Sequence, residues 1–263
     1  MSEVVQRSVE DGVALLTLNR PARLNAWTLD MEEAYFSLLE ECAATEEVRA
    51  IVVTGAGKGF CAGADMQELQ ALGQSSGDGA STSRDRRPQT FPLSIPKPIV
   101  AAINGGCAGI GLVQALMCDL RFAARDAKLT TAFARRGLVA EHGISWILPR
   151  LAGPARALDL LLSGRVVLGE EAAELGLVNR ALARESLLEE TLAYARDLAA
   201  NCSPSSMAAI KRQVYADLDR PPAAALAEAN RLMLESFAAP DFVEGVASFT
   251  ERRAPAFAAL ADG

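Results

Sequence analysis

The chain has 263 residues, of which 50% are hydrophobic and 22% are charged. This length and composition suit one large globular domain, or a core with a smaller appendage. The formal net charge of −7 argues against nucleic-acid binding, because neutralising phosphates requires a basic face. The chain contains a single histidine, so a histidine-rich metal site is excluded and we expect no bound metal.

Three features favour a cytoplasmic protein that makes no membrane contact. The sequence contains no apolar run of about 18 residues or more, so we expect no membrane-spanning helix. Residues 1–12 are polar and acidic, unlike a signal peptide or a transit peptide. The five cysteines are scattered without a CxxC spacing, which favours reduced thiols.

The first half of the chain alternates short strands with helices. Asp11-Gly12 is a turn dipeptide that predicts a hairpin, and Thr28 is a suitable N-cap for a helix. The predicted strands cover residues 4–9, 13–18, 50–55 and 97–103, with further short strands within 120–132. The predicted helices cover residues 28–44 and 65–72, and the polar segment 73–90 is expected to be a mobile loop.

The second half of the chain is mostly helical from Gly143 onward. The predicted helices cover residues 143–152, 154–163, 170–175, 185–200, 204–218, 222–238 and 241–252. Strands that alternate with helices, followed by a helical tail, predict an α/β protein with at least partly parallel strand pairing. We divide the chain into a core of residues 1–200 and a C-terminal helical region of residues 201–263.

Two units combine a strand, a glycine-rich loop and a helix: "IVVTGAGKGFCAGAD" from residue 51 and "IVAAINGGCAGIGLV" from residue 99. Glycine allows the backbone to turn tightly and lets main-chain N–H groups approach a ligand closely. These N–H groups precede a helix, where the helix dipole adds partial positive charge. Two such loops facing each other would form an oxyanion hole, whereas two tight turns that only pack helices on a sheet would show the same pattern.

Six segments along the chain carry a more specific signal: "LNRPARLNA", "GKGFCAGADMQEL", "KPIVAAINGGCAGIGLVQALMCDLRFA", "GLV…LPRLAGPARALDLLLSGR", "EAAELGLVNR" and "EGVASFTERR". In order and spacing they resemble the enoyl-CoA hydratase/isomerase family of the crotonase superfamily. The resemblance implies a crotonase-like spiral of ββα repeats with a C-terminal helical trimerisation region. It also implies an acyl-CoA thioester as substrate, no further cofactor, and a homotrimer or hexamer.

The resemblance also implies roles for residues of both glycine loops. The backbone N–H groups of Ala64 and Ile110 would polarise the thioester carbonyl, although the family usually has glycine where Ile110 stands. The CoA moiety would lie against five further residues: Arg23, Leu24, Ala62, Asp65 and Met66. Two of these allow a simpler interpretation, because Arg23 could be a solvated loop residue and Asp65 could simply cap its helix.

The hydratases of this family use two glutamates, and neither is present here. The corresponding positions are Val113 and Phe133, which cannot transfer a proton. In some relatives an acidic residue follows the "GL" turn by three positions, and here that residue is Glu141. A carboxyl group buried in apolar surroundings suits a proton shuttle, but Glu141 could instead be an exposed residue at a helix N-terminus. The only histidine, His142, adjoins it and could assist it or point away.

One carboxylate and an oxyanion hole are best suited to moving a double bond, so we expect enoyl-CoA isomerisation. Hydration by one glutamate and a bound water is an alternative. A second is hydrolysis or dehalogenation with Glu141 as nucleophile, which needs an aromatic acyl pocket that a chain with 5% aromatic residues hardly supports. A third is an acyl-CoA-binding oligomer without catalysis.

Overall fold

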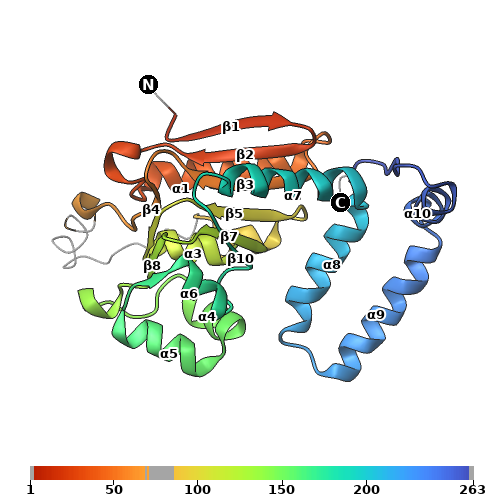
Figure 1. Ribbon diagram of the computed structural model, residues 1–263. Helices are drawn as coiled ribbons and strands as arrows, with labels where there is room; N and C mark the ends of the chain where they lie inside the picture. The colour runs from red at the N-terminus through yellow and green to blue at the C-terminus, as the bar shows by residue number, and fades with distance from the viewer. Residues whose placement is uncertain (1–2, 69, 71–85, 261–263) are drawn as a thin grey trace.

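The computed structural model describes residues 3–68, 70 and 86–260 (Figure 1). Its largest element is a six-stranded sheet with the strand order β1-β2-β3-β5-β7-β10. The hairpin of β1 and β2 is antiparallel, and the other neighbouring strands are parallel. The strands are β1 Val5–Glu10, β2 Val13–Leu18, β3 Ala50–Gly55, β5 Ile99–Ile103, β7 Leu120–Ala124 and β10 Arg180–Leu182.

A second sheet has four short strands in the order β4-β6-β8-β9. They are β4 Gly59–Cys61, β6 Gly106–Ala108, β8 Lys128–Thr130 and β9 Val167–Leu168. The pairs β3–β4, β5–β6 and β7–β8 each place their first strand in the large sheet and their second strand in the small one. Helical residues follow each pair, so the chain advances as a spiral of ββα units.

Helices cover the sheets and fill the C-terminal quarter of the chain. The longer ones are α1 Leu29–Ala44, α4 Ile144–Ala152, α5 Pro154–Ser163, α7 Leu187–Asn201, α8 Pro204–Asp217, α9 Pro222–Phe237 and α10 Pro240–Glu251. The shorter ones are α3 Ile110–Leu116, α6 Gly169–Glu174 and the 3-10 turns η1 Pro21–Arg23, η2 Phe91–Ser94 and η3 Ala134–Arg136. No helix of the described residues is long and apolar enough to cross a membrane.

Local chemistry explains α1, which packs against β1 and β2. The Thr28 hydroxyl accepts a hydrogen bond from the N–H of Met31 at 3.2 Å, which is the N-cap predicted from the sequence. Met31, Tyr35 and Phe36 are at most 1% exposed, so one face of the helix joins the core. Burying each of these side chains contributes on the order of 1.5–3 kcal/mol.

The hairpin, the strands of the large sheet up to β7 and the predicted helices that the structure describes are confirmed to within a few residues. Strands β4 and β6 were expected to be glycine-rich loops, and β9 and β10 were not predicted. These strands contain only two or three residues each, too few to show an alternating pattern. Of the predicted helix 65–72, residues 66–68 and 70 are helical, and residues 73–85 of the predicted loop lie outside the described part.

Helices α8 and α9 lie side by side and stand apart from the two sheets (Figure 1). The side chain of Asp119 ties α8 to the core. Its Oδ2 accepts hydrogen bonds from the N–H of Ile99 and from Nζ of Lys211, at 2.7 and 2.8 Å, and its Oδ1 accepts one from the hydroxyl of Tyr215. Asp119, which lies between α3 and β7, therefore has a structural role.

We predict that Asp119→Ala destabilises the protein by about 3–5 kcal/mol, because removing one partner of a buried ion pair leaves the other charge uncompensated. Lys211 is the affected partner, with a side chain only 7% exposed. Urea unfolding at fixed protein concentration measures the change. Asp126→Ala removes an exposed ion pair with Arg184 and serves as the control with little expected effect. Equal unfolding midpoints for the two variants would contradict the structural role of Asp119.

Candidate active site

A cavity of about 300 Å³ lies where the two glycine loops meet the segment that leads into α4. It is lined by all the site residues predicted from the sequence except Leu24 and Val113. The first loop contributes Ala62 and Ala64, and the second contributes Ile110. The fold therefore brings together residues that are far apart in the chain, although their roles stay predictions.

The glycines of the two loops allow the backbones to approach each other. Gly63 and Gly109 have φ values of 101° and 51°, in the region that side chains disfavour. A Cβ at Gly109 would lie 3.9 Å from Cα of Gly63. At Gly111 a Cβ would overlap the carbonyl oxygen of Cys61 and lie 2.7 Å from its Sγ. A side chain at Gly111 would therefore push α3 away from β4.

The N–H groups of Ala64 and Ile110 are free to bind a ligand oxygen. Trp27 and Ala64 form a parallel bridge, in which the N–H of Trp27 donates to Gly63 and the N–H of Asp65 donates to Trp27. That bridge leaves the N–H of Ala64 unused. Ile110 is the first residue of α3, where N–H groups have no acceptor within the helix. Among the described residues, neither N–H donates a hydrogen bond to a protein acceptor.

Asn25 ties the segment that carries Arg23 to the first glycine loop, and the sequence analysis missed this residue. Its side chain is fully buried, accepts a hydrogen bond from the N–H of Arg20 at 2.8 Å, and donates to the carbonyl oxygens of Ala56 and Gly59. Leu24 and Asn25 both have left-handed backbones, with φ near 50°. Asparagine tolerates that conformation, which is the one sequence signal that could have identified this residue. Leu24 is 48% exposed and lies outside the cavity lining.

Asp65 does cap the helical segment that follows it. Its Oδ1 accepts a hydrogen bond from the N–H of Gln67 at 3.0 Å, and its Oδ2 pairs with Nη2 of Arg20 at 2.9 Å. These contacts, the Gln67 N–H above all, hold the pKa of the Asp65 carboxyl below its usual range. The Asp65 carboxylate is therefore engaged by the protein at the edge of the cavity, while Arg23 and Met66 beside it are exposed.

Glu141 and His142 line the cavity from its third segment, the turn before α4. His142 Nε2 lies 3.5 Å from Oε2 of Glu141, so the two side chains face each other rather than pointing apart. The Glu141 side chain is 32% exposed, and full burial beside Val113 and Phe133 is not observed. Burial lowers the pKa of His142, and Arg86 lowers it further, whereas Glu141 and Glu32 act in the opposite direction.

The two positions where the resemblance places the hydratase glutamates, Val113 and Phe133, differ in their surroundings. Phe133 is 5% exposed and lines the cavity. Val113 is fully buried within α3 and does not line the cavity. Glu141 and Asp65 are the carboxylates among the described residues that line the cavity. The cavity therefore offers one carboxylate that no arginine holds.

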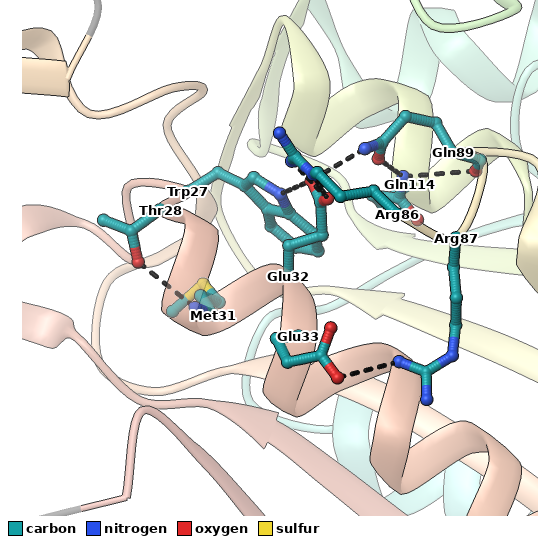
Figure 2. A network of polar contacts seen from close by, with 9 residues as sticks. All are labelled: Trp27, Thr28, Met31, Glu32, Glu33, Arg86, Arg87, Gln89 and Gln114. Carbon is teal, nitrogen blue, oxygen red and sulfur yellow. Dashed lines mark hydrogen bonds and ion pairs between the residues drawn. The ribbon is translucent and has the colours of Figure 1, made fainter. Parts of the chain in front are cut away.

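A buried polar network adjoins this site, and sequence reasoning did not find it (Figure 2). The Glu32 carboxylate of α1 accepts hydrogen bonds from Nε1 of Trp27 at 3.2 Å, from the guanidinium of Arg86, and from Nε2 of Gln89 at 2.7 Å. Gln89 in turn accepts a hydrogen bond from Nε2 of Gln114 on α3 at 2.7 Å. The network fixes the segment from Arg86 onward against both helices.

The cavity combines two backbone N–H groups that have no protein acceptor with the carboxylate of Glu141, and no cluster of three possible metal ligands occurs in the described part of the chain. The family model for enoyl-CoA hydratase/isomerase matches residues 8–259. The chain therefore belongs to the enoyl-CoA hydratase/isomerase family, whose members act on acyl-CoA, and its crotonase fold is confirmed.

Particular relatives agree with this assignment. The chain is 35% identical to the 1,2-epoxyphenylacetyl-CoA isomerase of Escherichia coli (strain K12), over 98% of this chain and 99% of that protein. The solved structure of an enoyl-CoA hydratase from Mycobacterium marinum is 50% identical in sequence and superimposes with a TM-score of 0.71. The match covers 83% of this chain and all of that chain. An enoyl-CoA hydratase from Polaromonas sp. JS666 is 29% identical, with a TM-score of 0.88 and 96% and 99% covered.

We predict that Ile110→Pro lowers turnover of an enoyl-CoA substrate by about 10²–10³-fold, because it removes one oxyanion donor. Ile110 occupies the first helical position, where proline is tolerated, so the fold should survive. Ile110→Val keeps the N–H and is the matched control, with turnover expected near the wild-type value. Steady-state kinetics and circular dichroism of both variants test this. Equal turnover in both would end the oxyanion assignment for Ile110.

Proposed function

We propose that this protein moves the carbon–carbon double bond of an enoyl-CoA thioester. The observation that carries the proposal is the composition of the cavity. It combines the N–H groups of Ala64 and Ile110, which have no protein acceptor among the described residues, with Glu141, a carboxylate that pairs with no arginine in that part of the chain. The Escherichia coli relative is an isomerase that acts on an epoxide of an acyl-CoA, which supports isomerisation of an acyl-CoA as the general class of reaction.

In the proposed reaction the Glu141 carboxylate removes a proton from C2 of a 3-enoyl-CoA. The electron pair of that C–H bond moves towards the thioester, and the resulting negative charge on its oxygen is stabilised by the N–H groups of Ala64 and Ile110. Glu141 then returns a proton to C4, so the double bond shifts from C3–C4 to C2–C3 and no atom is gained or lost. The side chain of Ile110 adds bulk beside the thioester.

The CoA moiety would enter past Arg23, Met66 and Ala62, which line the cavity on the side of the first glycine loop. Arg23 would pair with its phosphates, as in the interpretation of the "RPARLNA" segment. We place the enzyme in the cytoplasm, because all five cysteines are free thiols and four of them are buried.

Hydration is the second candidate, because relatives with this fold are described as enoyl-CoA hydratases. Glu141 and His142, 3.5 Å apart, could hold one water between them and the acyl chain. Hydration would add that water across the double bond, whereas isomerisation leaves the mass of the substrate unchanged. Product mass therefore separates the two reactions.

We predict that Glu141→Gln lowers isomerisation by about 10²–10⁴-fold, because an amide cannot take up the C2 proton. Binding of CoA thioesters should hardly change, since glutamine keeps the size of the side chain. The assay compares 3-enoyl-CoA and 2-enoyl-CoA substrates with the wild type and the variant. Equal activity in both proteins refutes the role of Glu141, and no activity in either would favour the acyl-CoA-binding alternative.

We also propose a trimer or a hexamer, based on the surface of α9. This helix has no buried residue, and four of its large apolar side chains are between 46% and 65% exposed: Leu226, Met233, Leu234 and Phe237. An apolar surface of this kind normally marks a contact with another chain. Light scattering at micromolar concentration is expected to give a multiple of 27.8 kDa, at least threefold. A monomer would contradict the proposal, and Leu234→Glu should weaken the assembly.

A further inference from the structure

Glu141 and His142 form a pair that reaches from the cavity to solvent. Both residues line the cavity, and their side chains are 32% and 35% exposed. The distance of 3.5 Å between Oε2 and Nε2 is slightly longer than a hydrogen bond. Such contacts between acid and base residues often tighten when substrate binds.

The backbone is strained in a way that keeps the two side chains together. In extended backbone, successive side chains point to opposite sides. His142 instead has a φ of 59°, in the left-handed region, and Gly143 follows with a φ of 82°. The left-handed conformation is unfavourable for a residue other than glycine. This turn places two consecutive side chains in one cavity.

The other charged groups of the cavity lining are poorly suited to exchange protons near neutral pH. Arg23 and Arg136 stay protonated, and Asp65 is held by Arg20 and by the N–H of Gln67. Burial and the nearby Arg86 lower the pKa of His142, against the opposing charges of Glu141 and Glu32. These effects favour the neutral ring, which can accept a proton.

We propose that His142 exchanges the proton carried by Glu141 with solvent, an inference that rests on the proposed isomerisation. After Glu141 has taken the C2 proton, the carboxyl group passes it to Nε2 of His142, which leaves a carboxylate and an imidazolium. The imidazolium releases one proton to water and gains another. A proton derived from solvent then returns to Glu141 and is delivered to C4, so protons and charge balance.

The test follows isomerisation of a 3-enoyl-CoA in D2O and measures deuterium in the product by mass spectrometry at low conversion. The wild-type product is expected to carry deuterium, and His142→Asn should lower the deuterated fraction several-fold while isomerisation continues. Asparagine tolerates the left-handed backbone, and His142→Gln is a second variant should the first fail to fold. Ser145→Ala, exposed on the first turn of α4 and outside the cavity lining, is the control expected to match the wild type.

Two outcomes separate this inference from the proposed function. A wild type that does not isomerise the substrate would overturn the proposed function and with it the inference. An active wild type whose product carries the same deuterium as that of His142→Asn would overturn the inference alone.

The single histidine allows a second measurement that needs no turnover, because the chain gives one set of imidazole resonances in NMR. Removing the neighbouring negative charge in Glu141→Gln destabilises the imidazolium, so the pKa of His142 should fall. Arg86→Gln removes an opposing positive charge, so that pKa should rise. A His142 titration unchanged in Glu141→Gln would show that the two side chains do not interact, which also overturns the inference.

Discussion

The site depends on the close approach of α3 to β4. At Gly111 there is no room for a side chain, because a Cβ would overlap the Cys61 carbonyl oxygen. Parallel pairing of β4 with β6 brings the ends of both strands to the same edge, where Ala64 and Ile110 follow. This contact determines how far apart their N–H groups lie, and with that the place where negative charge on a thioester oxygen would be stabilised. A methyl group added at Gly111 would displace the N–H groups of the site more than it would disturb the two sheets.

Backbone strain gathers around the cavity, while the core that supports it is regular. Leu24, Asn25, Ala132 and His142 all have positive φ and lie in or next to the cavity walls. Such conformations cost about 1–3 kcal/mol each and persist only where surrounding contacts hold them. In β3 and β5 every residue is buried, and these strands lie in the middle of the large sheet. The free energy gained by burying these strands offsets the free-energy cost of the strained residues around the cavity.

Sequence patterns predicted what is encoded locally. The turn at Asp11-Gly12 and the cap at Thr28 depend on neighbouring residues, and the structure has them where they were expected. The two glycine-rich segments also turn tightly, but each contains a short strand that was expected to be loop. Asn25 and Glu32 were missed because their roles arise from partners such as Gly59 and Arg86, about 30 to 50 residues away. For the same reason, the resemblance identified Val113 as a position facing substrate, but only the packing of α3 shows that it lies behind the cavity wall.

Valine and phenylalanine at the two positions where the resemblance places the hydratase glutamates would affect the binding of water as well as proton transfer. Phe133 lines the cavity with an apolar ring, and the side chain of Val113, which is buried outside the lining, is also apolar. Gln114, the next residue on α3, directs its amide N–H to Gln89 and lies outside the cavity lining. This side of the cavity therefore offers few groups that bind water. The N–H groups of Ala64 and Ile110 would then act in a medium of lower dielectric constant, which strengthens their interaction with a negative charge. Hydration needs an ordered water at the acyl chain, whereas a double-bond shift needs only a carboxylate that can reach two carbons. The apolar ring of Phe133 and the carboxylate of Glu141, which line the same cavity, are therefore consistent with the proposed double-bond shift.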